Sequence, residues 1–400
     1  MKVIFLVQEN MPQETSKAIW QRLGCISHEY DSYLITGGTK PSNLPDTKTV
    51  KLEGVGTSNE GSISRRIISK IRYSFRCYYE LRDIGIERGD IVYTFQTYDL
   101  LLGFVFKYIC GLKWVVDILD LPEFQLEDIR AAIKKARIGK IAMIVLFLVL
   151  ARLGIKHSNL VITAARNEGE GFARVLLEKY QVRMASIVAI PNGVDPALIV
   201  DVSTAVPERS KYGGRLRLIY IGGVGERRGT LFLLNVLCRI QQEIPSADLV
   251  LVGEVERGFA EKVRASMVLL GLAKDVFLRG EMNHNDVIAE LDASDVGLYP
   301  FPSQGVHDYA IPVKVGEYLA RGKPVVATAL EGVRGSVDHG VNGFLLPYGD
   351  VAAWSECICS LWRDQERYRE MAINAVKKAQ KMEWSALNER VLAAMSRLSE

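Results

Sequence analysis

Hydrophobic and polar positions follow two alternating patterns along the chain. Short runs of apolar and β-branched residues, typical of buried strands, are separated by stretches with the repeat of amphipathic helices. The predicted strands of the first half are 2–7, 32–37, 49–52, 90–95, 113–118, 159–164 and 186–193, with helices over 14–26 and 61–82 among them. Those of the second half are 216–222, 247–253, 275–280, 295–300, 324–328 and 343–347. Continuous apolar strands separated by helices predict doubly wound α/β sheets, parallel and covered on both faces.

The strands fall into two groups. Residues 196–215 between them carry Pro, Ser, Gly and charges without periodicity, as an interdomain linker does. We expect an N-terminal domain over 1–196, a linker over 197–214 and a C-terminal domain over 215–382. A terminal helix over 383–400 would pack back toward the N-terminal domain. Two such domains would form a cleft between the carboxyl ends of their strands, where ligands bind in these folds.

Composition narrows the class of protein. The chain has 400 residues, 48% of them hydrophobic and 24% charged, which is typical of an ordered globular protein. The net charge of +3 does not indicate nucleic-acid binding. Six scattered cysteines and no clustered histidines predict reduced thiols in a cytoplasmic protein and no structural zinc site. The apolar start is interrupted at Gln8 and Glu9, so we expect a first strand there and not a signal peptide.

One segment is unusually apolar. Residues 141–151, "IAMIVLFLVLA", follow four basic residues, Lys134, Lys135, Arg137 and Lys140. A membrane span needs roughly 20 apolar residues, so this run does not cross a bilayer alone. Two interpretations remain. The run is a helix buried inside the domain, or 134–152 lies at the inner face of the membrane with its basic residues at anionic headgroups.

The stretch 309–328, "YAIPVKVGEYLARGKPVVAT", combines a helix start with charge. Pro312 suits a first helical turn, where the backbone amides of Val313 and Lys314 would point outward as an anion site. Lys314 adds a full positive charge. Glu317 lies three residues on, on nearly the same face, and can accept a hydrogen bond from a sugar hydroxyl beside a bound phosphate. The alternative is a solvated Lys–Glu pair on a helix surface.

A glycine-rich loop opens the second domain. "YIGGVGERRGT", residues 220–230, follows its first strand and begins a helix. Glycines allow close approach of a backbone to a ligand, and Arg227 and Arg228 sit where a pyrophosphate would be held. Many such turns carry glycines for geometry alone.

Four signatures occur in order: "AIPNGVD" (189–195), "KVGEYLARGKPVVAT" (314–328), "GVNGFLLPYGD" (340–350) and "EWS" (383–385). Together they resemble a family-4 glycosyltransferase of the GT-B fold. The resemblance implies a nucleotide-diphosphate-sugar donor bound mainly by the second domain, with no metal or separate cofactor. It further implies transfer, with retained anomeric configuration, to a hydroxyl of a glycan or lipid-linked acceptor.

The resemblance also assigns roles to donor-binding residues. Glu317 would contact the donor ribose, and Arg228 stands where the family usually has a lysine that holds the diphosphate. The amides from Ile311 through Val313 to Lys314 would meet the same diphosphate.

Two positions depart from the family pattern. The usual glycine–arginine pair here reads Gly222–Gly223, so Gly223 replaces an arginine whose contact Arg227 could supply. Tyr309 replaces a glutamate that many members carry, and the adjacent Asp308 could substitute for it near the reacting sugar.

The acceptor side has one candidate. "DILDLPE", residues 117–123, resembles the family's acidic loop, and Asp120 could orient or deprotonate the acceptor hydroxyl. Its alternative role is to cap the next helix. Two other functions are compatible with the same fold, a nucleotide-sugar epimerase and a non-catalytic partner subunit. Nucleotide release that depends on the acceptor would separate a transferase from both.

Overall fold

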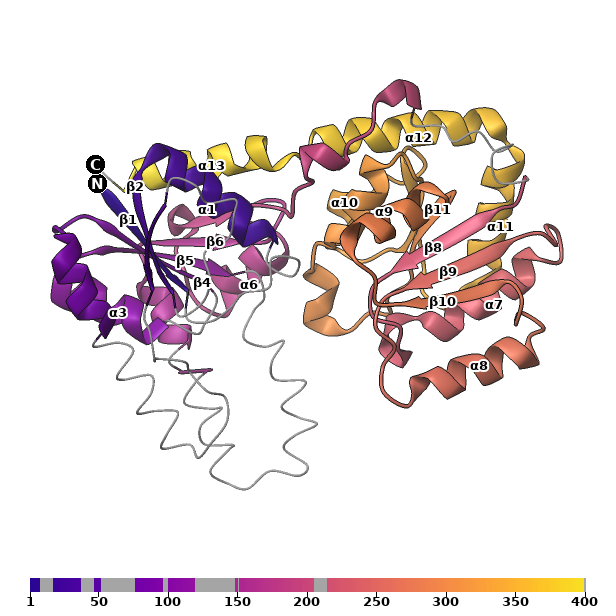
Figure 1. The fold of residues 1–400 in the computed structure, drawn as a ribbon, viewed down its shortest axis with the longest axis horizontal. Coiled ribbons are helices and arrows are strands. Elements are labelled where there is room, and N and C mark those ends of the chain that lie inside the picture. The colour runs from indigo at the N-terminus through magenta and orange to yellow at the C-terminus, as the bar shows by residue number, and fades with distance from the viewer. Residues whose placement is uncertain are drawn as a thin grey trace. The chain divides into compact units, whose positions relative to one another are not determined.

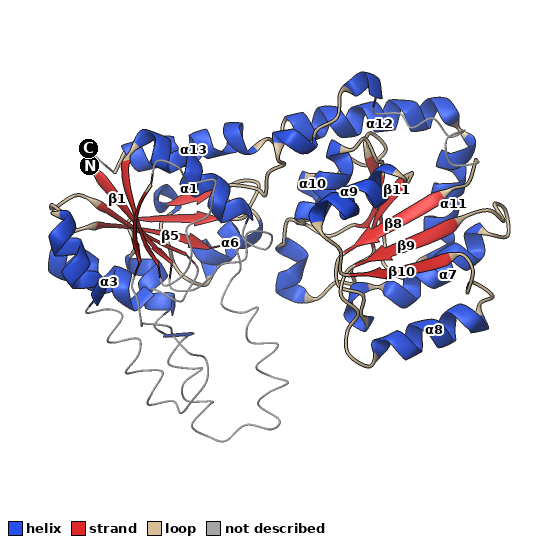
Figure 2. Ribbon diagram, in the orientation of Figure 1, coloured by secondary structure: helices blue, strands red, loops and turns tan. Residues whose placement is uncertain are grey.

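The computed structural model describes residues 1–7, 17–36, 47–51, 76–95, 100–118, 148–149, 151–204 and 214–398. The chain divides into two compact units, Met1–Pro191 with Trp384–Glu400, and Asn192–Glu383 (Figure 1). Each unit is built on a parallel sheet with helices on both faces (Figure 2). The predicted doubly wound α/β class is confirmed, and every predicted strand overlaps an observed one.

The first unit contains a seven-stranded sheet in the order β3-β2-β1-β4-β5-β6-β7. Its strands are β1 (Lys2–Val7), β2 (Asp31–Thr36), β3 (Lys48–Lys51), β4 (Ile91–Phe95), β5 (Lys113–Ile118), β6 (Leu160–Thr163) and β7 (Ile187–Ala189). Its helices are α1 (Lys17–Glu29), α3 (Leu100–Cys110), α6 (Gly171–Glu178) and α13 (Trp384–Ser396), with further helical residues at 76–84 and 151–157.

The C-terminal helix α13 belongs to the core of the first unit. Val391 and Met395 are buried with Trp20 of α1 and with the strand residue Phe5. The side-chain amide of Asn388 donates a hydrogen bond to one backbone carbonyl in α1, that of Gln21. The chain therefore completes its first core with its last helix, which Figure 1 shows beside α1.

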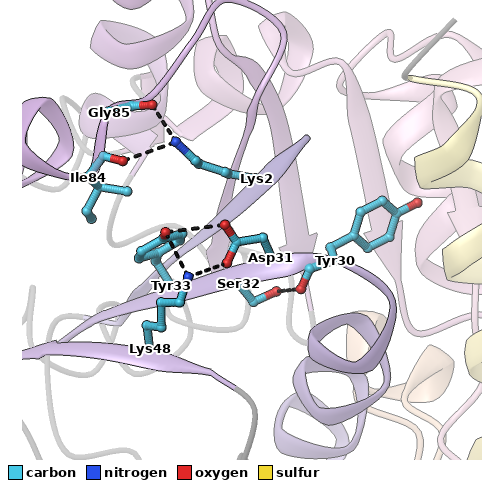
Figure 3. A network of polar contacts seen from close by, with 8 residues as sticks. All are labelled: Lys2, Tyr30, Asp31, Ser32, Tyr33, Lys48, Ile84 and Gly85. Atoms are coloured by element: carbon cyan, nitrogen blue, oxygen red, sulfur yellow. Dashed lines mark hydrogen bonds and ion pairs between the residues drawn. The ribbon is translucent and has the colours of Figure 1, made fainter.

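A polar network ties the start of the first sheet together (Figure 3). The ammonium of Lys2 donates to the carbonyls of Ile84 at 3.1 Å and Gly85 at 2.5 Å. Across the neighbouring strands, Asp31 accepts from Lys48 at 2.9 Å and from Tyr33 at 3.3 Å. Lys2, Asp31 and Lys48 are the first residues of β1, β2 and β3, so the network lies at the amino ends of these strands and the carboxyl ends are left for ligands.

The second unit contains a six-stranded sheet in the order β10-β9-β8-β11-β12-β13. Its strands are β8 (Arg217–Ile221), β9 (Asp248–Val252), β10 (Val276–Gly280), β11 (Val296–Tyr299), β12 (Val325–Thr328) and β13 (Gly343–Leu346). Its helices are α7 (Thr230–Ile240), α8 (Phe259–Leu269), α9 (His284–Asp292), α10 (Val313–Ala320), α11 (Val351–Arg363) and α12 (Gln365–Gln380).

Two hydrophobic clusters cover the two faces of this sheet. One gathers around the fully buried Trp354 of α11 with residues of α7 and α8. The other gathers around the buried Tyr318 of α10 with residues of α12. The stretch 197–204, expected within the linker, lies against this second cluster, because the amide of Val200 donates to the carbonyl of Ala320 at 3.0 Å.

The sheet order places a ligand site in the second unit. The order reverses between β8 and β11, which are neighbours although β9 and β10 lie between them along the chain. In doubly wound folds the loops after the two strands at such a reversal diverge and leave a crevice at their carboxyl ends. The glycine-rich loop after β8 and the segment from β11 to α10 are the two loops that meet there.

Candidate active site

The glycine-rich loop folds back against the end of β9. Gly222 has φ +137°, a conformation that side-chain-bearing residues rarely adopt, and its amide donates to the carbonyl of Val252 at 2.8 Å. A Cβ atom on Gly222 would lie 2.0 Å from the Nζ atom of Lys314. The absence of a side chain at Gly222 therefore makes the space that the ammonium of Lys314 occupies.

A second glycine fixes the position of the arginines. Gly229 follows the short 3₁₀ turn Glu226–Arg228 and begins α7 with a left-handed φ of +76°. A Cβ there would lie 2.0 Å from the carbonyl oxygen of Pro300, so only glycine allows this approach to the segment after β11. Arg228 is thereby held over that segment.

Two cations share one aromatic ring. The Cζ atom of Arg228 lies 5.2 Å from the centroid of the Phe301 ring, and Nζ of Lys314 lies 5.5 Å from the same centroid. Lys314 also lies 5.1 Å from the ring centroid of Tyr220. Each contact contributes about 0.5–2 kcal/mol depending on desolvation. Within the part of the chain that the structure describes, neither cationic group has a hydrogen-bond acceptor or an ion-pair partner.

Burial and the neighbouring charge of Arg228 destabilise the protonated form of Lys314. Desolvation, with a smaller contribution from the nearby Arg228, lowers its pKa to about 8, although Glu317 acts in the opposite direction. The buried ammonium of Lys314 and the neighbouring charge of Arg228 are two positive charges close together. A bound anion would restore the pKa and is the partner that this arrangement favours.

The amino end of α10 adds backbone donors to the same place. Pro312 is the residue before the helix, in an extended conformation, and Val313 and Lys314 are its first two residues. Amides at these two positions have no acceptor within a helix. The partial positive charge of the helix end therefore adds to that of the two side chains. The predicted anion site at this helix start is thus assembled from two separate loops.

Glu317 lies one turn further along α10, and its charge acts on Lys314. The next residue, Tyr318, is fully buried, and its hydroxyl accepts a hydrogen bond from the amide of Ile221 at 2.8 Å. That bond fixes α10 against the end of β8. The helix face that carries Lys314 and Glu317 is consequently held beside the glycine-rich loop.

The remaining second-domain candidates have different surroundings. The carboxylate of Asp308 accepts from the amide of Gln304 at 2.8 Å and from the hydroxyl of Ser303 at 2.5 Å, which is the bonding of a turn cap. Tyr309 follows it and is half-buried. The side chain of Arg227 is exposed, and its backbone carbonyl accepts from the side chain of Gln304 at 2.9 Å. Roles for these three residues stay predictions.

Gly223, Ile311 and Val313 complete the predicted donor set. The carbonyl of Gly223 accepts from the hydroxyl of Tyr220 at 3.0 Å. Ile311 is buried, whereas 38% of Val313 is exposed at the helix start. The structure therefore brings Gly223 and Arg228 from one loop to the helix that carries Lys314 and Glu317.

The acceptor-side candidate Asp120 lies outside the described residues. Asp117, three residues earlier, ends β5 and is fully buried. It accepts from Arg22 at 2.5 Å and from the hydroxyl of Tyr93 at 2.9 Å. Burial opposes the charge on Arg22, but Asp117 and Tyr93 together outweigh it and raise the pKa of the guanidinium. This buried network anchors the strand from which the acidic loop departs.

The described residues contain no cluster of His, Cys, Asp and Glu that could hold a metal ion. None of their helices combines the length and the apolar character that a membrane span requires. Most of the segment 134–152 lies outside the described residues.

Comparison with known proteins identifies the family of the second unit. Residues 215–364, which include the glycine-rich loop, Lys314 and Glu317, match the family described as glycosyl transferases group 1. The second unit is a group 1 glycosyltransferase domain. The predicted resemblance is confirmed for this domain, which contains every donor-binding candidate.

Curated relatives share about half of the chain. A phosphatidyl-myo-inositol mannosyltransferase of Mycobacterium leprae is 29% identical over 211 residues, which cover 51% of this chain and 52% of that protein. A D-inositol 3-phosphate glycosyltransferase of Corynebacterium jeikeium is 26% identical over 224 residues, 54% of this chain and 52% of that protein. The chain thus spans about half the length of the curated relatives it matches.

Solved structures resemble the chain over its whole length. Anabaena HepE in complex with UDP superposes with a TM-score of 0.73 at 17% identity, over 99% of this chain and 100% of that chain. This likeness shows the fold, which is the GT-B arrangement of two doubly wound units. The group 1 domain is one half of that fold, and the first unit is the other half.

Sequence reasoning did not assign the roles that four residues have in building the site. Gly222 makes room for Lys314, and Tyr220 and Phe301 provide the aromatic faces. Asn192 donates a hydrogen bond to the carbonyl of Ile311 at 2.6 Å. The signature "AIPNGVD" contained Asn192, but nothing in a single sequence pairs it with a residue 119 positions away.

Proposed function

We propose that the protein is a retaining glycosyltransferase that moves a sugar from a nucleoside-diphosphate donor to a hydroxyl of a glycan or lipid-linked acceptor. The observation that carries the proposal is the convergence of Lys314 and Arg228 on Phe301 beside the amino end of α10. Two cations without an acceptor among the described residues, together with a helix start, favour a ligand with two negative charges close together. A diphosphate has that chemistry.

The same groups support the chemical step. When the bond between the sugar and the diphosphate breaks, negative charge grows on the departing diphosphate. Fixed positive groups at that position stabilise the transition state more than the ground state, which is the effect that raises turnover. Lys314 and Arg228 therefore act on the leaving group. Glu317, on the same helix face, binds the donor ribose in this proposal.

The donor is proposed to carry uridine. The support is the crystal structure of HepE, which holds UDP in the same fold. The proposal for a lipid-linked acceptor is supported by the mycobacterial relative, whose name gives phosphatidyl-myo-inositol as its substrate. Asp120 is proposed to orient the acceptor hydroxyl and Asp308 to act near the reacting sugar.

We also propose that the first unit attaches to the inner membrane surface. Its described part carries an aromatic strip, which we define as Phe104, Tyr108, Val149, Leu153 and His157. The ring of His157 lies 5.7 Å from that of Phe104, and its Nδ1 atom lies 2.7 Å from the hydroxyl of Tyr108, so α3 and the helix over 151–157 form one surface.

This aromatic strip has the character of an interfacial surface. Exposed fractions are 38% for Phe104, 55% for Tyr108, 49% for Val149 and 45% for Leu153. Lys107, Arg152 and Lys156 are close in sequence to residues of the strip, and the basic cluster 134–140 lies between its two segments in the sequence. Aromatic side chains with flanking lysines and arginines suit the headgroup region of an anionic membrane.

Acceptor-dependent release of the nucleotide tests the proposed activity. The purified protein is incubated with a UDP-sugar, with and without membrane lipid extract, and free UDP is measured. A transferase releases UDP only when the acceptor is present. Interconversion of the sugar without transfer would indicate the epimerase instead, and release of UDP without acceptor would be hydrolysis of the donor by water. A protein that binds the donor and never releases UDP would be a non-catalytic subunit.

A further inference from the structure

Asn192 links two distant parts of the second unit. It begins that unit, and its side-chain nitrogen donates to the carbonyl of Ile311 at 2.6 Å. Ile311 is buried and lies two residues before the first residue of α10. The neighbouring group is a carbonyl, which only accepts, so the nitrogen of the amide and not its oxygen must face it. The orientation of the Asn192 side chain is therefore fixed by its partner.

The same loop touches α10 at a second point. A Cβ atom on Gly316 would lie 2.8 Å from a methyl carbon of Val194, which is tighter than an ordinary contact. The amide of Val194 donates to the carbonyl of Met382 at 2.7 Å, so the loop is itself anchored. Asn192 and Val194 thus hold α10 just before its start and one turn along it.

Stability alone does not account for an asparagine at this position. The Oδ1 atom of Asn192 is buried and has no hydrogen-bond partner in the described structure. A buried acceptor without a partner lowers stability, which offsets much of what the bond to Ile311 contributes. An apolar residue of similar size would avoid that loss. The bond to the Ile311 carbonyl is consequently the contribution that this side chain makes.

We infer that Asn192 is a positioning residue, which fixes the amino end of α10 in the orientation that binds the donor diphosphate. The inference rests on the proposed function. The carbonyl of Ile311 and the amides of Val313 and Lys314 belong to one short backbone stretch. When the carbonyl is held, the amides keep their direction and Lys314 stays over Gly222. Fixed donors bind an anion more tightly than donors that must be ordered first.

The test compares a nucleoside diphosphate with the corresponding monophosphate. Calorimetry gives dissociation constants of UDP and UMP for the wild type, for Asn192→Ala and for Asn374→Ala. Asn374 is the matched control, because its side-chain amide also donates to a backbone carbonyl of the second unit, that of Val341 at 3.3 Å. If another base binds better, its diphosphate and monophosphate are used instead.

We expect Asn192→Ala to weaken UDP roughly tenfold and UMP less than about twofold, with Asn374→Ala near wild type for both. Equal losses for UDP and UMP would show that Asn192 serves only the fold, and unchanged constants would show that the bond is unimportant. Either result overturns the inference and leaves the proposed function standing. A wild type that binds no nucleoside diphosphate at all contradicts the proposed function, and the inference with it.

A second variant covers the case in which Asn192→Ala is poorly folded. Asn192→Asp keeps the shape of the side chain but places an oxygen against the Ile311 carbonyl and a negative charge near the helix start. We expect a larger loss of UDP affinity than for Asn192→Ala. Full UDP affinity in Asn192→Asp overturns the inference.

Discussion

The ammonium of Lys314 occupies the place where the side chain of Gly222 would begin. A Cβ on Gly222 would lie 2.0 Å from Nζ and 3.3 Å from Cε of Lys314. The glycine has φ +137° and comes from the loop after β8, whereas the lysine comes from α10. The close approach of the Gly222 backbone to the Lys314 side chain therefore helps to assemble the site. The predictions below start from this contact.

Gly222→Ala should weaken donor binding by displacing Lys314. The new methyl group overlaps Nζ, and alanine is strained at this φ, so we expect the affinity for UDP to fall tenfold or more, with a loss of roughly 1–3 kcal/mol in stability. Gly169→Ala, outside the proposed site, is the matched control, since its Cβ would meet nothing closer than the Oδ1 atom of Asn167 at 3.6 Å. Calorimetry and denaturant unfolding of both variants provide the comparison. Equal UDP affinity in the two variants would mean that the place of Lys314 does not matter.

Donor affinity should depend on pH through Lys314. Burial, together with the neighbouring Arg228, lowers the pKa of this ammonium to about 8. The protonated form attracts the diphosphate, so affinity is retained below about pH 8 and falls as the pH rises through that value, by up to about tenfold per pH unit. Binding above pH 8 should also take up a proton. Calorimetry in buffers of different ionisation enthalpy measures both effects, and Lys314→Met should bind weakly and without this dependence.

The lowered pKa of Lys314 also makes the stability of the fold depend on pH. Stability should rise with pH over the range in which donor affinity falls. Lysine in an unfolded chain has a pKa near 10.5, above the value of about 8 for Lys314 in the folded protein. Between these values the unfolded chain binds the proton more tightly, so the penalty of burying the charge is relieved as the pH rises. The stability advantage of Lys314→Met over wild type should therefore shrink from pH 8 toward pH 10.5. An advantage that stays constant over this window contradicts the lowered pKa.

Arg228→Ala should reduce turnover more than stability. The side chain is exposed and makes one cation–π contact, with Phe301, so we expect a change of about 0.5–1 kcal/mol in unfolding free energy. Loss of a charge from the leaving diphosphate should lower kcat roughly 10- to 100-fold. Arg227→Ala removes the neighbouring guanidinium and should have the smaller effect. If the two variants have the same kcat, Arg228 has no special place in the site.

Glu317→Ala should weaken the nucleotide and not the diphosphate alone. The proposed contact is with the donor ribose, so we expect the affinity for UDP to fall about tenfold and that for inorganic pyrophosphate to stay close to wild type. Glu370→Ala, at an exposed position of α12, controls for a general loss of negative charge. Wild-type UDP affinity in Glu317→Ala would exclude the ribose contact.

Membrane attachment should depend on the aromatic strip. We expect the protein to co-sediment with vesicles that contain anionic lipid and to be released by high salt. Changing Phe104, Tyr108 and Leu153 to Ser should abolish sedimentation. Val268 and Leu269 of α8 are 71% and 86% exposed, so their replacement by Ser is the matched control and should leave binding intact. A wild type that stays in the supernatant at low salt rules the attachment out.

The fold could be predicted from the sequence to a large extent. Parallel strands buried on both faces are continuous apolar runs, and "KWVVDI" was placed at the observed residues of β5, Lys113–Ile118. The helix start at Val313 and its end before Gly322, which has φ +67°, also follow local rules. Local chemistry was sufficient where a single segment determines its own structure.

The candidate site could be predicted only in part. Lys314 and Glu317 share one helix, so their spacing placed them together, and the glycine-rich loop indicated Arg228. The aromatic ring of Phe301 between the two cations and the bond from Asn192 to Ile311 depend on the sheet order and on contacts between distant loops. Hydrophobic periodicity contains no information about such pairings. Asp120 and most of 134–152 lie outside the described residues, so their roles stay predictions.

Thermal stabilisation by a panel of UDP-, GDP-, ADP- and dTDP-sugars most directly tests donor binding at α10. A ligand at 100 times its dissociation constant adds about 2.7 kcal/mol to the stability of the folded state, which raises Tm by several degrees. We predict that one class of nucleotide sugar raises the Tm of the wild type and that the shift is lost in the double variant Lys314→Met, Glu317→Ala. No shift with any donor, or the same shift in wild type and double variant, would contradict a donor site at the amino end of α10.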